Sequence, residues 1–96
     1  MDLTNVRLDK EDKEVLASVL LSKRLPQVLL TLAEQGKSPT QIAKELDKQP
    51  THIIKYCKLL MNKNLVQIEK NESKNTAIYY LTEKGQSFIP IIQLIY

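Results

Sequence analysis

The sequence predicts a mostly helical α+β domain in which four helices come first, a two-stranded β-hairpin follows, and one more helix ends the chain. Apolar residues recur at helical spacing up to about residue 62, and the period then changes to two over residues 65–81. The chain has 96 residues, of which 43% are apolar and 26% charged, enough for one hydrophobic core and too few for two. We therefore expect a single folded domain over residues 1–96.

The first two helices are predicted at residues 9–21 and 25–34. Acidic residues crowd the start of the first, which favours the helix dipole. Pro26 is tolerated in the first turn of a helix but not in its interior, so a junction at residues 22–26 separates the two. Gly36 is expected to stop the second helix. Val15, Leu16, Val19 and Leu20 recur at helical spacing in the first helix, and the inward stripe of the second is predicted to be Val28, Leu29 and Leu32.

The next two helices are predicted at residues 39–46 and 50–62, joined by a turn of three residues. Ser38 is a typical N-cap, and Pro39 and Pro50 each suit a first helical position. Asn64 is expected in the left-handed conformation that often ends a helix. The inward residues of this pair are predicted to be Ile42, Ala43, Leu46, Ile53, Cys57 and Leu60.

A hairpin and a final helix complete the expected order. Residues 65–68 and 77–81 are short runs of β-forming residues that flank a polar stretch at 70–76, which predicts a hairpin with a long tip. Residues 82–85 suit the first turn of a helix that reaches Tyr96. Pro90 is expected to kink this helix or to lie in its first turns.

The positive charge of the chain is concentrated in one segment. The net charge is +3 and the sequence pI is about 9.0. Acidic and basic residues cancel over residues 1–46, 65–76 and 77–96, whereas residues 47–64 carry four lysines against Asp47. A local basic patch is typical of a phosphate-binding face, although a solvated lysine face would look the same on charge alone.

Three stretches carry a resemblance to a known class of proteins. They are Gln41-Ile42-Ala43-Lys44-Glu45-Leu46, the segment from Leu46 to Val66, and Tyr80-Leu81-Thr82-Glu83-Lys84-Gly85. Together with the order of two helices and a hairpin, they resemble the winged helix-turn-helix of MarR-type and ArsR-type transcription regulators over residues 22–85. The resemblance implies a helix-turn-helix at about 38–62, a wing at about 65–81 and a recognition helix at 50–62 that enters the major groove of double-stranded DNA.

The resemblance also implies which residues would contact DNA. The expected contacts are Gln49, Thr51, His52, Lys55, Tyr56, Lys58, Lys70 and Lys74. His52 is equally well explained as a solvated residue, and Tyr56 also suits the gap between helices. Ile54 stands where these regulators commonly have a small polar residue, and it would suit a thymine methyl or a cover provided by the domain. The wing lacks the arginine that many members place in the minor groove.

The terminal helices carry more apolar surface than one domain can cover. In residues 83–96 two apolar stripes lie on adjoining sides, and Leu20 and Leu21 point in different directions. This surplus predicts a homodimer built from helices 9–21 and 83–96, with a monomer whose ends pack together as the alternative. The expected interface residues are Leu20, Ile89, Ile92, Ile95 and Tyr96.

Several classes of function find no support in the residues. There is no nucleophile motif and no glycine-rich phosphate loop, so we expect no enzyme and no cofactor. Cys57 is the single cysteine, which excludes an internal disulfide and the cysteine pairs of metal-sensing ArsR-type proteins. We expect it to be a buried, inert thiol rather than a redox switch. No signal peptide, membrane span or effector cavity is evident, so a cytoplasmic protein is expected.

The sequence therefore favours a sequence-specific transcription regulator that binds DNA as a homodimer. Two alternatives stay open. One is a winged-helix module that binds other proteins, with an incidental basic face. The other is a DNA-binding protein of plasmid or viral replication or partition.

Overall fold

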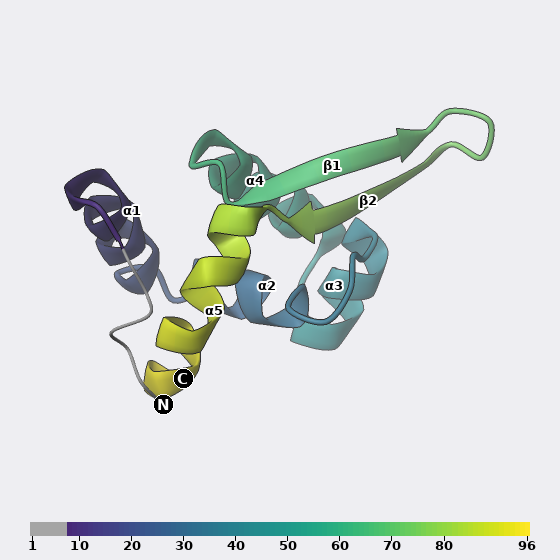
Figure 1. The fold of residues 1–96 in the computed structure, drawn as a ribbon. Coiled ribbons are helices and arrows are strands. Elements are labelled where there is room, and N and C mark those ends of the chain that lie inside the picture. Colours follow the sequence, from purple (N-terminus) through teal and green to yellow (C-terminus); the bar gives the residue numbers. More distant parts are fainter. Residues whose placement is uncertain (1–7) are drawn as a thin grey trace.

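The computed structural model describes residues 8–96, which form a helical body from which a hairpin projects (Figure 1). The elements of this part of the chain are α1 (Lys10–Leu20), α2 (Leu25–Thr31), α3 (Pro39–Leu46), α4 (Pro50–Asn62), β1 (Val66–Asn71), β2 (Thr76–Leu81) and α5 (Glu83–Ile95). The predicted class, a mostly helical α+β fold with one antiparallel hairpin, is confirmed.

The first helix follows the prediction closely, and the second is shorter than predicted. Asp9 caps α1, since its carboxylate accepts a hydrogen bond from the Asp12 N–H at 2.7 Å. The predicted end of α2 at residue 34 is wrong, because the chain leaves helical geometry at Leu32. Gly36 has no positive φ and is not a helix cap. It is required for close approach instead, as a Cβ there would lie 2.4 Å from Tyr80 Cδ1.

The predicted helix-turn-helix is present as α3 and α4. Ser38 and Gln41 form a reciprocal capping box at the start of α3, with hydrogen bonds of 2.9 and 3.1 Å. Asp47 then takes a left-handed conformation, with φ of 55°, and this turns the chain toward Pro50. Asn64 after α4 has a φ of 62°, as predicted. Asp47 and Asn64, two non-glycine residues with positive φ, therefore set the direction of the chain before and after α4.

The hairpin is longer and its tip shorter than predicted. Lys70 pairs with Ala77 and Asn71 with Thr76, so polar residues expected in the tip belong to the strands. Near the tip, both faces of the hairpin are open to solvent. Polar side chains can therefore occupy the paired strands there without being buried. Asn75, with φ of 50°, closes the remaining turn.

The last helix is anchored at the base of the hairpin. Thr82 caps it by accepting from the Gly85 N–H at 3.0 Å, and the Thr82 hydroxyl donates to the Asn64 carbonyl at 2.6 Å. A Cβ at Gly85 would lie 2.1 Å from the Leu65 carbonyl oxygen, so only glycine lets α5 approach this closely. Pro90 lies inside the helix, where it removes one backbone donor, and α5 nevertheless continues to Ile95.

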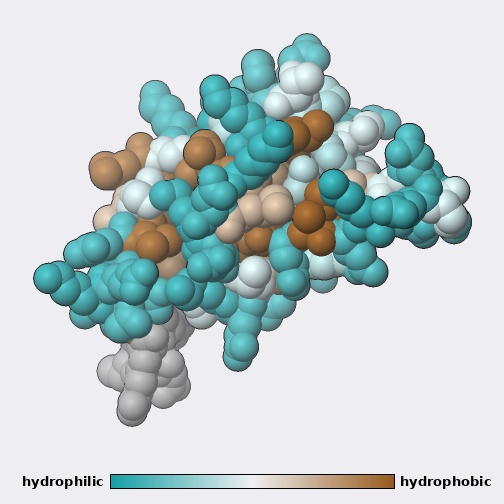
Figure 2. All heavy atoms as spheres, turned by 90° about the horizontal axis from the view of Figure 1, so that it is seen from above, coloured by the Kyte–Doolittle hydropathy of each residue, from teal (hydrophilic) through white to brown (hydrophobic). Residues whose placement is uncertain are grey.

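One hydrophobic core joins all of the helices to the base of the hairpin. Ten of its side chains are completely buried: Val19, Val28, Leu29, Ile42, Ile53, Cys57, Leu60, Leu65, Phe88 and Ile92. Leu46, which was predicted to point inward, is only half-buried at the edge of this cluster, as are Val15 and Leu20. The outer end of the hairpin is hydrophilic (Figure 2) and lies outside the core.

Candidate nucleic-acid interface

The helix α4 has one buried and one exposed side. Ile53, Cys57 and Leu60 are completely buried on the first side, and they attach the helix to α2, α3 and β1. Thr51, His52, Lys55 and Lys58 are exposed on the other. We call these four residues the basic face. The division is the one that a helix needs if it is to be held by its own domain and offered to a ligand at the same time.

Gln49 is placed at the start of this helix. It is the N-cap residue and it is exposed, yet its side chain makes no capping hydrogen bond. Its backbone carbonyl accepts from the His52 and Ile53 N–H groups at 3.0 and 3.2 Å. The side chain of Gln49 is therefore available beside Thr51, at the positive end of the helix dipole.

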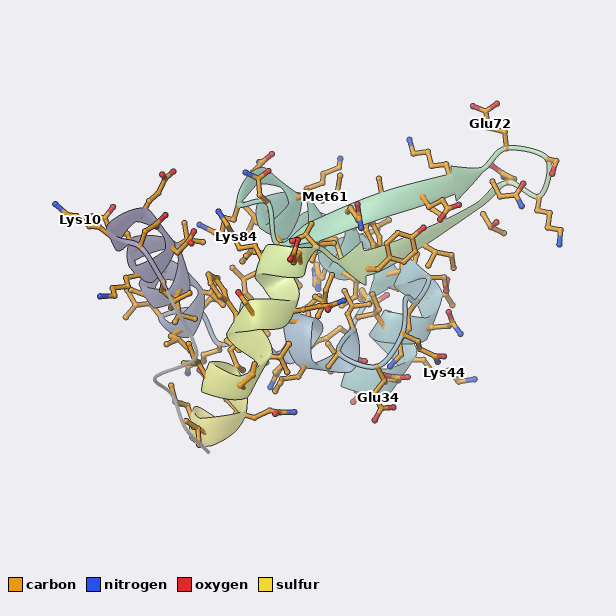
Figure 3. The ribbon with its side chains drawn as sticks, in the orientation of Figure 1. Lys10, Glu34, Lys44, Met61, Glu72 and Lys84 are labelled. Atoms are coloured by element: carbon orange, nitrogen blue, oxygen red, sulfur yellow. The ribbon has the colours of Figure 1, made fainter. Side chains whose placement is uncertain are left out.

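Neither Lys55 nor Lys58 forms an ion pair with an acidic side chain within residues 8–96. The ion pairs in this part of the chain join Lys37 to Glu45 and Lys84 to Asp12, the second of which links α5 to α1 (Figure 3). Lys63 belongs to the same basic segment but is turned toward α1, where its ammonium group donates to Ser18 Oγ at 3.0 Å. The positive charge that α4 presents to solvent thus comes from its middle turns.

Two predicted positions are only partly available. Tyr56 is half-buried and packs against the core, so it lies at the border of the basic face. Ile54 is half-buried as well. Leu59 was missed by sequence reasoning: it is 44% exposed and follows Lys55 by one helical turn. That spacing was a usable signal, because residues four apart on a helix share a face.

The hairpin lysines are not brought together with the basic face. Lys70 lies near the outer end of β1 and Lys74 lies in the tip; both are exposed, and the hairpin projects away from the helices (Figure 1). A shallow hollow of about 250 Å³ lies beside them. It is lined by Lys70, Asn71, Glu72, Asn75, Thr76 and Ala77. Glu69 is engaged across the strands by the Tyr80 hydroxyl, while Glu72 points away at the outer end (Figure 3).

Apolar side chains are exposed where α1 and α5 end. Leu21 is 87% exposed, and Leu94, Ile95 and Tyr96 are each more than half exposed. The Tyr96 hydroxyl lies 3.4 Å from the Leu20 carbonyl, to which it donates, so the two helix ends are neighbours. We call Leu21, Leu94, Ile95 and Tyr96 the terminal apolar patch. Leu20 itself is half-buried.

Two residues expected in a dimer interface are placed elsewhere. Ile92 is completely buried and Ile89 is 9% exposed, both within the core of the chain itself. The expectation that they face a partner is therefore corrected. Both residues lie on the side of α5 that packs against α2, and Leu94, which is not among the expected interface residues, is exposed instead.

Cys57 is a free, buried thiol, as predicted. Burial raises its pKa to about 12, because the thiolate would lose its hydration in the core. Tyr79 also has a raised pKa, caused first by its own burial and then by the neighbouring Cys57. A thiol in this environment is protonated at neutral pH and is a poor nucleophile.

Residues 8–96 show neither a metal centre nor a membrane span. No three His, Cys, Asp or Glu side chains in this range are gathered where they would bind a metal ion. None of the described helices combines the length and apolar character that crossing a membrane requires.

Known proteins match this chain through their structures. No protein-family model and no curated protein sequence matches it. The regulator YodB from Bacillus subtilis, in its reduced form, superposes with a TM-score of 0.78 at 20% identity, over 93% of this chain and 88% of that one. ZitR from Lactococcus lactis gives 0.64 at 24% identity, over 77% of this chain and 49% of the other. The chain thus spans about half the length of ZitR.

A third structure is a homodimeric winged helix-turn-helix DNA-binding domain from Mycobacterium bovis, described as a possible ArsR-family transcriptional regulator. It gives a TM-score of 0.73 at 16% identity, over 88% of this chain and 77% of that domain. YodB is described as a transcriptional regulator, and so is SlyA, which gives a TM-score of 0.74 at 22% identity. The predicted resemblance is thereby confirmed at the level of structure: this chain has the winged-helix fold of transcriptional regulators.

Proposed function

We propose that this protein is a transcription regulator of the cytoplasm that binds double-stranded DNA with α4 in the major groove. The observation that carries the proposal is the division of α4: its apolar residues are completely buried, while Thr51, His52, Lys55 and Lys58 are exposed. A helix held in this way fits the width of the groove and matches the negative charge of the phosphates. The winged-helix neighbours support the same assignment.

The side chains divide into two proposed roles. Gln49, Thr51 and His52 lie at the start of α4, where polar groups of a recognition helix meet base edges. Lys55 and Lys58 lie further along and would pair with phosphates, as would Lys70 and Lys74 on the wing. Tyr56 is half-buried against the core at the border of the basic face, and we propose that it contacts the backbone of the duplex.

The protein is proposed to act as a homodimer through the terminal apolar patch. Four large apolar side chains at one end of a domain of this size are more than scattered exposure accounts for. A two-fold axis at this patch would pair it with itself and would place two α4 helices on successive major grooves, about 34 Å apart. The Mycobacterium bovis neighbour is homodimeric, which supports this arrangement.

Selection of bound sequences from random duplex DNA, followed by titration over a range of salt concentrations, tests the function. A dimer that makes six to ten phosphate contacts is expected to show a steep linear fall of log K with log salt, with a slope of about −5 to −9. Enrichment of a two-fold symmetric site is expected. Absence of enrichment together with a flat salt dependence would contradict the proposal.

Leu59 is the observation that favours a second candidate, a module that binds other proteins. A leucine that is 44% exposed beside the basic face would suit an apolar pocket of a protein partner. On DNA the same side chain would lie against sugar or a thymine methyl. Replacing Leu59 by lysine separates the two, because an added charge would strengthen binding to a polyanion and weaken binding to an apolar pocket.

A further inference from the structure

Lys37 joins three parts of the fold that the helix-turn-helix needs in fixed positions. Its backbone pairs with β2 in both directions: the Lys37 N–H donates to the Tyr79 carbonyl at 2.9 Å, and the Tyr79 N–H donates to the Lys37 carbonyl at 2.8 Å. This isolated bridge lies on the edge of β2 that β1 leaves free. The loop before α3 is thereby fastened to the wing.

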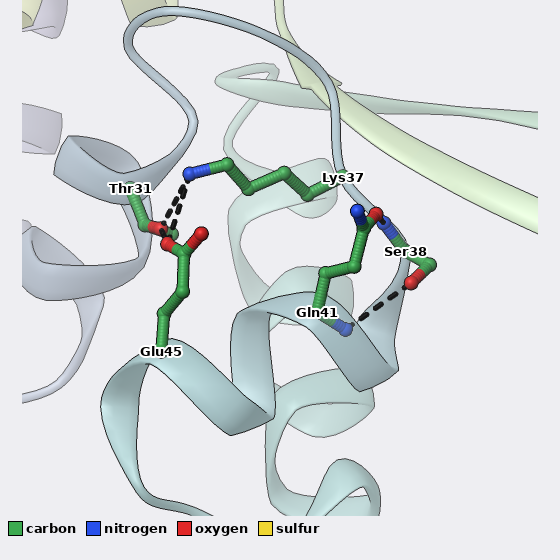
Figure 4. Close-up of polar contacts among 5 residues, drawn as sticks. All are labelled: Thr31, Lys37, Ser38, Gln41 and Glu45. Carbon is green, nitrogen blue, oxygen red and sulfur yellow. Dashed lines mark hydrogen bonds and ion pairs between the residues drawn. The ribbon is translucent and has the colours of Figure 1, made fainter.

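The side chain of Lys37 turns away from the wing and reaches two helices (Figure 4). Its ammonium group donates to Thr31 Oγ1 at 3.0 Å and to a carboxylate oxygen of Glu45 at 2.9 Å. The Thr31 hydroxyl also donates to that oxygen. Thr31 ends α2 and Glu45 lies in the last turns of α3, so one side chain connects both helices.

The environment of Lys37 keeps it in this role. Its side chain is only 13% exposed, whereas that of Glu45 is 49% exposed. Hydrogen bonds from Thr31 and Lys37 lower the pKa of the Glu45 carboxyl, so the acceptor stays ionised. A Cβ at Gly36 would overlap the side chains of Ile78 and Tyr80, so the backbone of this loop lies close against the wing.

We propose that Lys37 is a positioning residue that fixes the angle between the wing and the helix-turn-helix. The inference rests on the proposed function, since the angle matters for a ligand that both elements contact. Lys37 is a lysine that does not itself bind phosphate, because its ammonium group is already occupied inside the protein. It contributes to DNA binding by holding β2 and α3 in position, and α3 in turn positions α4.

Replacement of Lys37 by methionine tests the proposal, because it keeps the backbone bridge and most of the side-chain volume while removing the ammonium group. Affinity of the full chain for its selected duplex is expected to fall about tenfold with an unchanged salt slope. A lost phosphate contact would instead lower the slope by about one per protomer. Lys37→Arg is expected to restore the affinity, and Lys44→Met, at an exposed lysine on α3 (Figure 3), is the matched control.

A second measurement is independent of DNA. Spin labels on cysteines introduced at Ser73 in the tip and Thr40 on α3, both exposed, report the distance between the wing and the helix-turn-helix. Lys37→Met is expected to broaden this distance distribution, and Lys44→Met is not. An unchanged distribution, or a salt slope that falls with the affinity, would overturn the proposal. If Lys37→Met does not fold, Glu45→Gln removes the same ion pair more gently and is read by the same two measurements.

If the wild-type chain binds no duplex, the proposed function fails, and the distance distribution still decides whether Lys37 holds the wing.

Discussion

The helices α4 and α5 have the same length and similar burial, but they present different chemistry to solvent. Each has 13 residues and each supplies completely buried side chains to the core. On α4 the exposed residues include Thr51, His52, Lys55 and Lys58, whereas the exposed end of α5 carries Leu94, Ile95 and Tyr96. A polar, basic surface suits a polyanion, and an apolar surface suits another protein.

The comparison separates two kinds of information in an amphipathic helix. The buried residues fix the helix to the core, and they are similarly apolar in α4 and α5. The exposed residues determine which kind of ligand the helix can contact, and these residues differ between α4 and α5. Substitutions in the buried and exposed stripes of α4 and α5 should therefore have different effects.

The buried stripe is tested by two neighbouring leucines of α4. Leu60 is completely buried and Leu59 is 44% exposed. Leu60→Ala is expected to lower the free energy of unfolding by about 2–5 kcal/mol, because it leaves a cavity in the core. Leu59→Ala is expected to change it by less than about 0.5 kcal/mol. Urea denaturation measures both, and equal losses would show that α4 does not have the orientation described.

The apolar end of α5 is tested by a charge. Ile95→Glu is expected to weaken the proposed homodimer by about 3 kcal/mol, roughly a hundredfold in the dissociation constant, because each protomer would bury a carboxylate without a partner. Gln93→Glu adds the same charge at an exposed neighbouring position and serves as the control. Sedimentation equilibrium measures the oligomeric state. A wild-type protein that is monomeric at every concentration would remove the dimer from the proposal.

The basic face of α4 is tested by removing one charge. Lys55→Ala is expected to reduce affinity for all duplexes to a similar degree, by about 1 kcal/mol, and to lower the salt slope by about two in a dimer. Lys44→Ala removes an exposed lysine from α3 and is expected to change the slope less. Fluorescence anisotropy at several salt concentrations gives both values. An identical slope in wild type and Lys55→Ala would place the phosphates elsewhere.

The thiol beneath the basic face gives the smallest effect. Burial keeps Cys57 protonated in the folded state up to a pH of about 12, while in the unfolded chain a thiol ionises near pH 8.5. The unfolded state therefore binds fewer protons as the pH rises through 8.5, and the free energy of unfolding is expected to fall by about 0.7 kcal/mol between pH 8 and pH 9. Cys57→Ala should remove this contribution. Denaturation of both proteins at these two pH values checks it; an equal pH dependence of the two proteins would contradict the burial.

Local signals in the sequence were enough to predict the helices and most of the residues exposed on α4. Caps such as Ser38, prolines at first helical positions and the spacing of Ile53, Cys57 and Leu60 act within one or two turns, so they can be recognised without tertiary contacts. The exposed positions of Thr51, His52, Lys55 and Lys58 follow from the same spacing.

Features that depend on distant partners were not predictable. After the early end of α2, the chain runs to Lys37, whose backbone pairs with Tyr79, 42 residues further along the chain. Ile89 and Ile92 were assigned to the wrong side of α5 because two apolar stripes adjoin, and only packing against α2 decides between them. The strand residues Lys70 and Asn71 gave no β signal, since their pairing depends on the register set nearer the body.

Gly85 lies where α5 contacts the segment that follows α4. With no side chain there, α5 starts in direct contact with the backbone at Leu65, the residue that leads from α4 into the wing. In the proposed dimer, the joint at Gly85 would transmit the geometry of the two-fold axis to each wing and recognition helix. The spacing between the halves of a palindromic operator would then depend on the absence of a single methyl group.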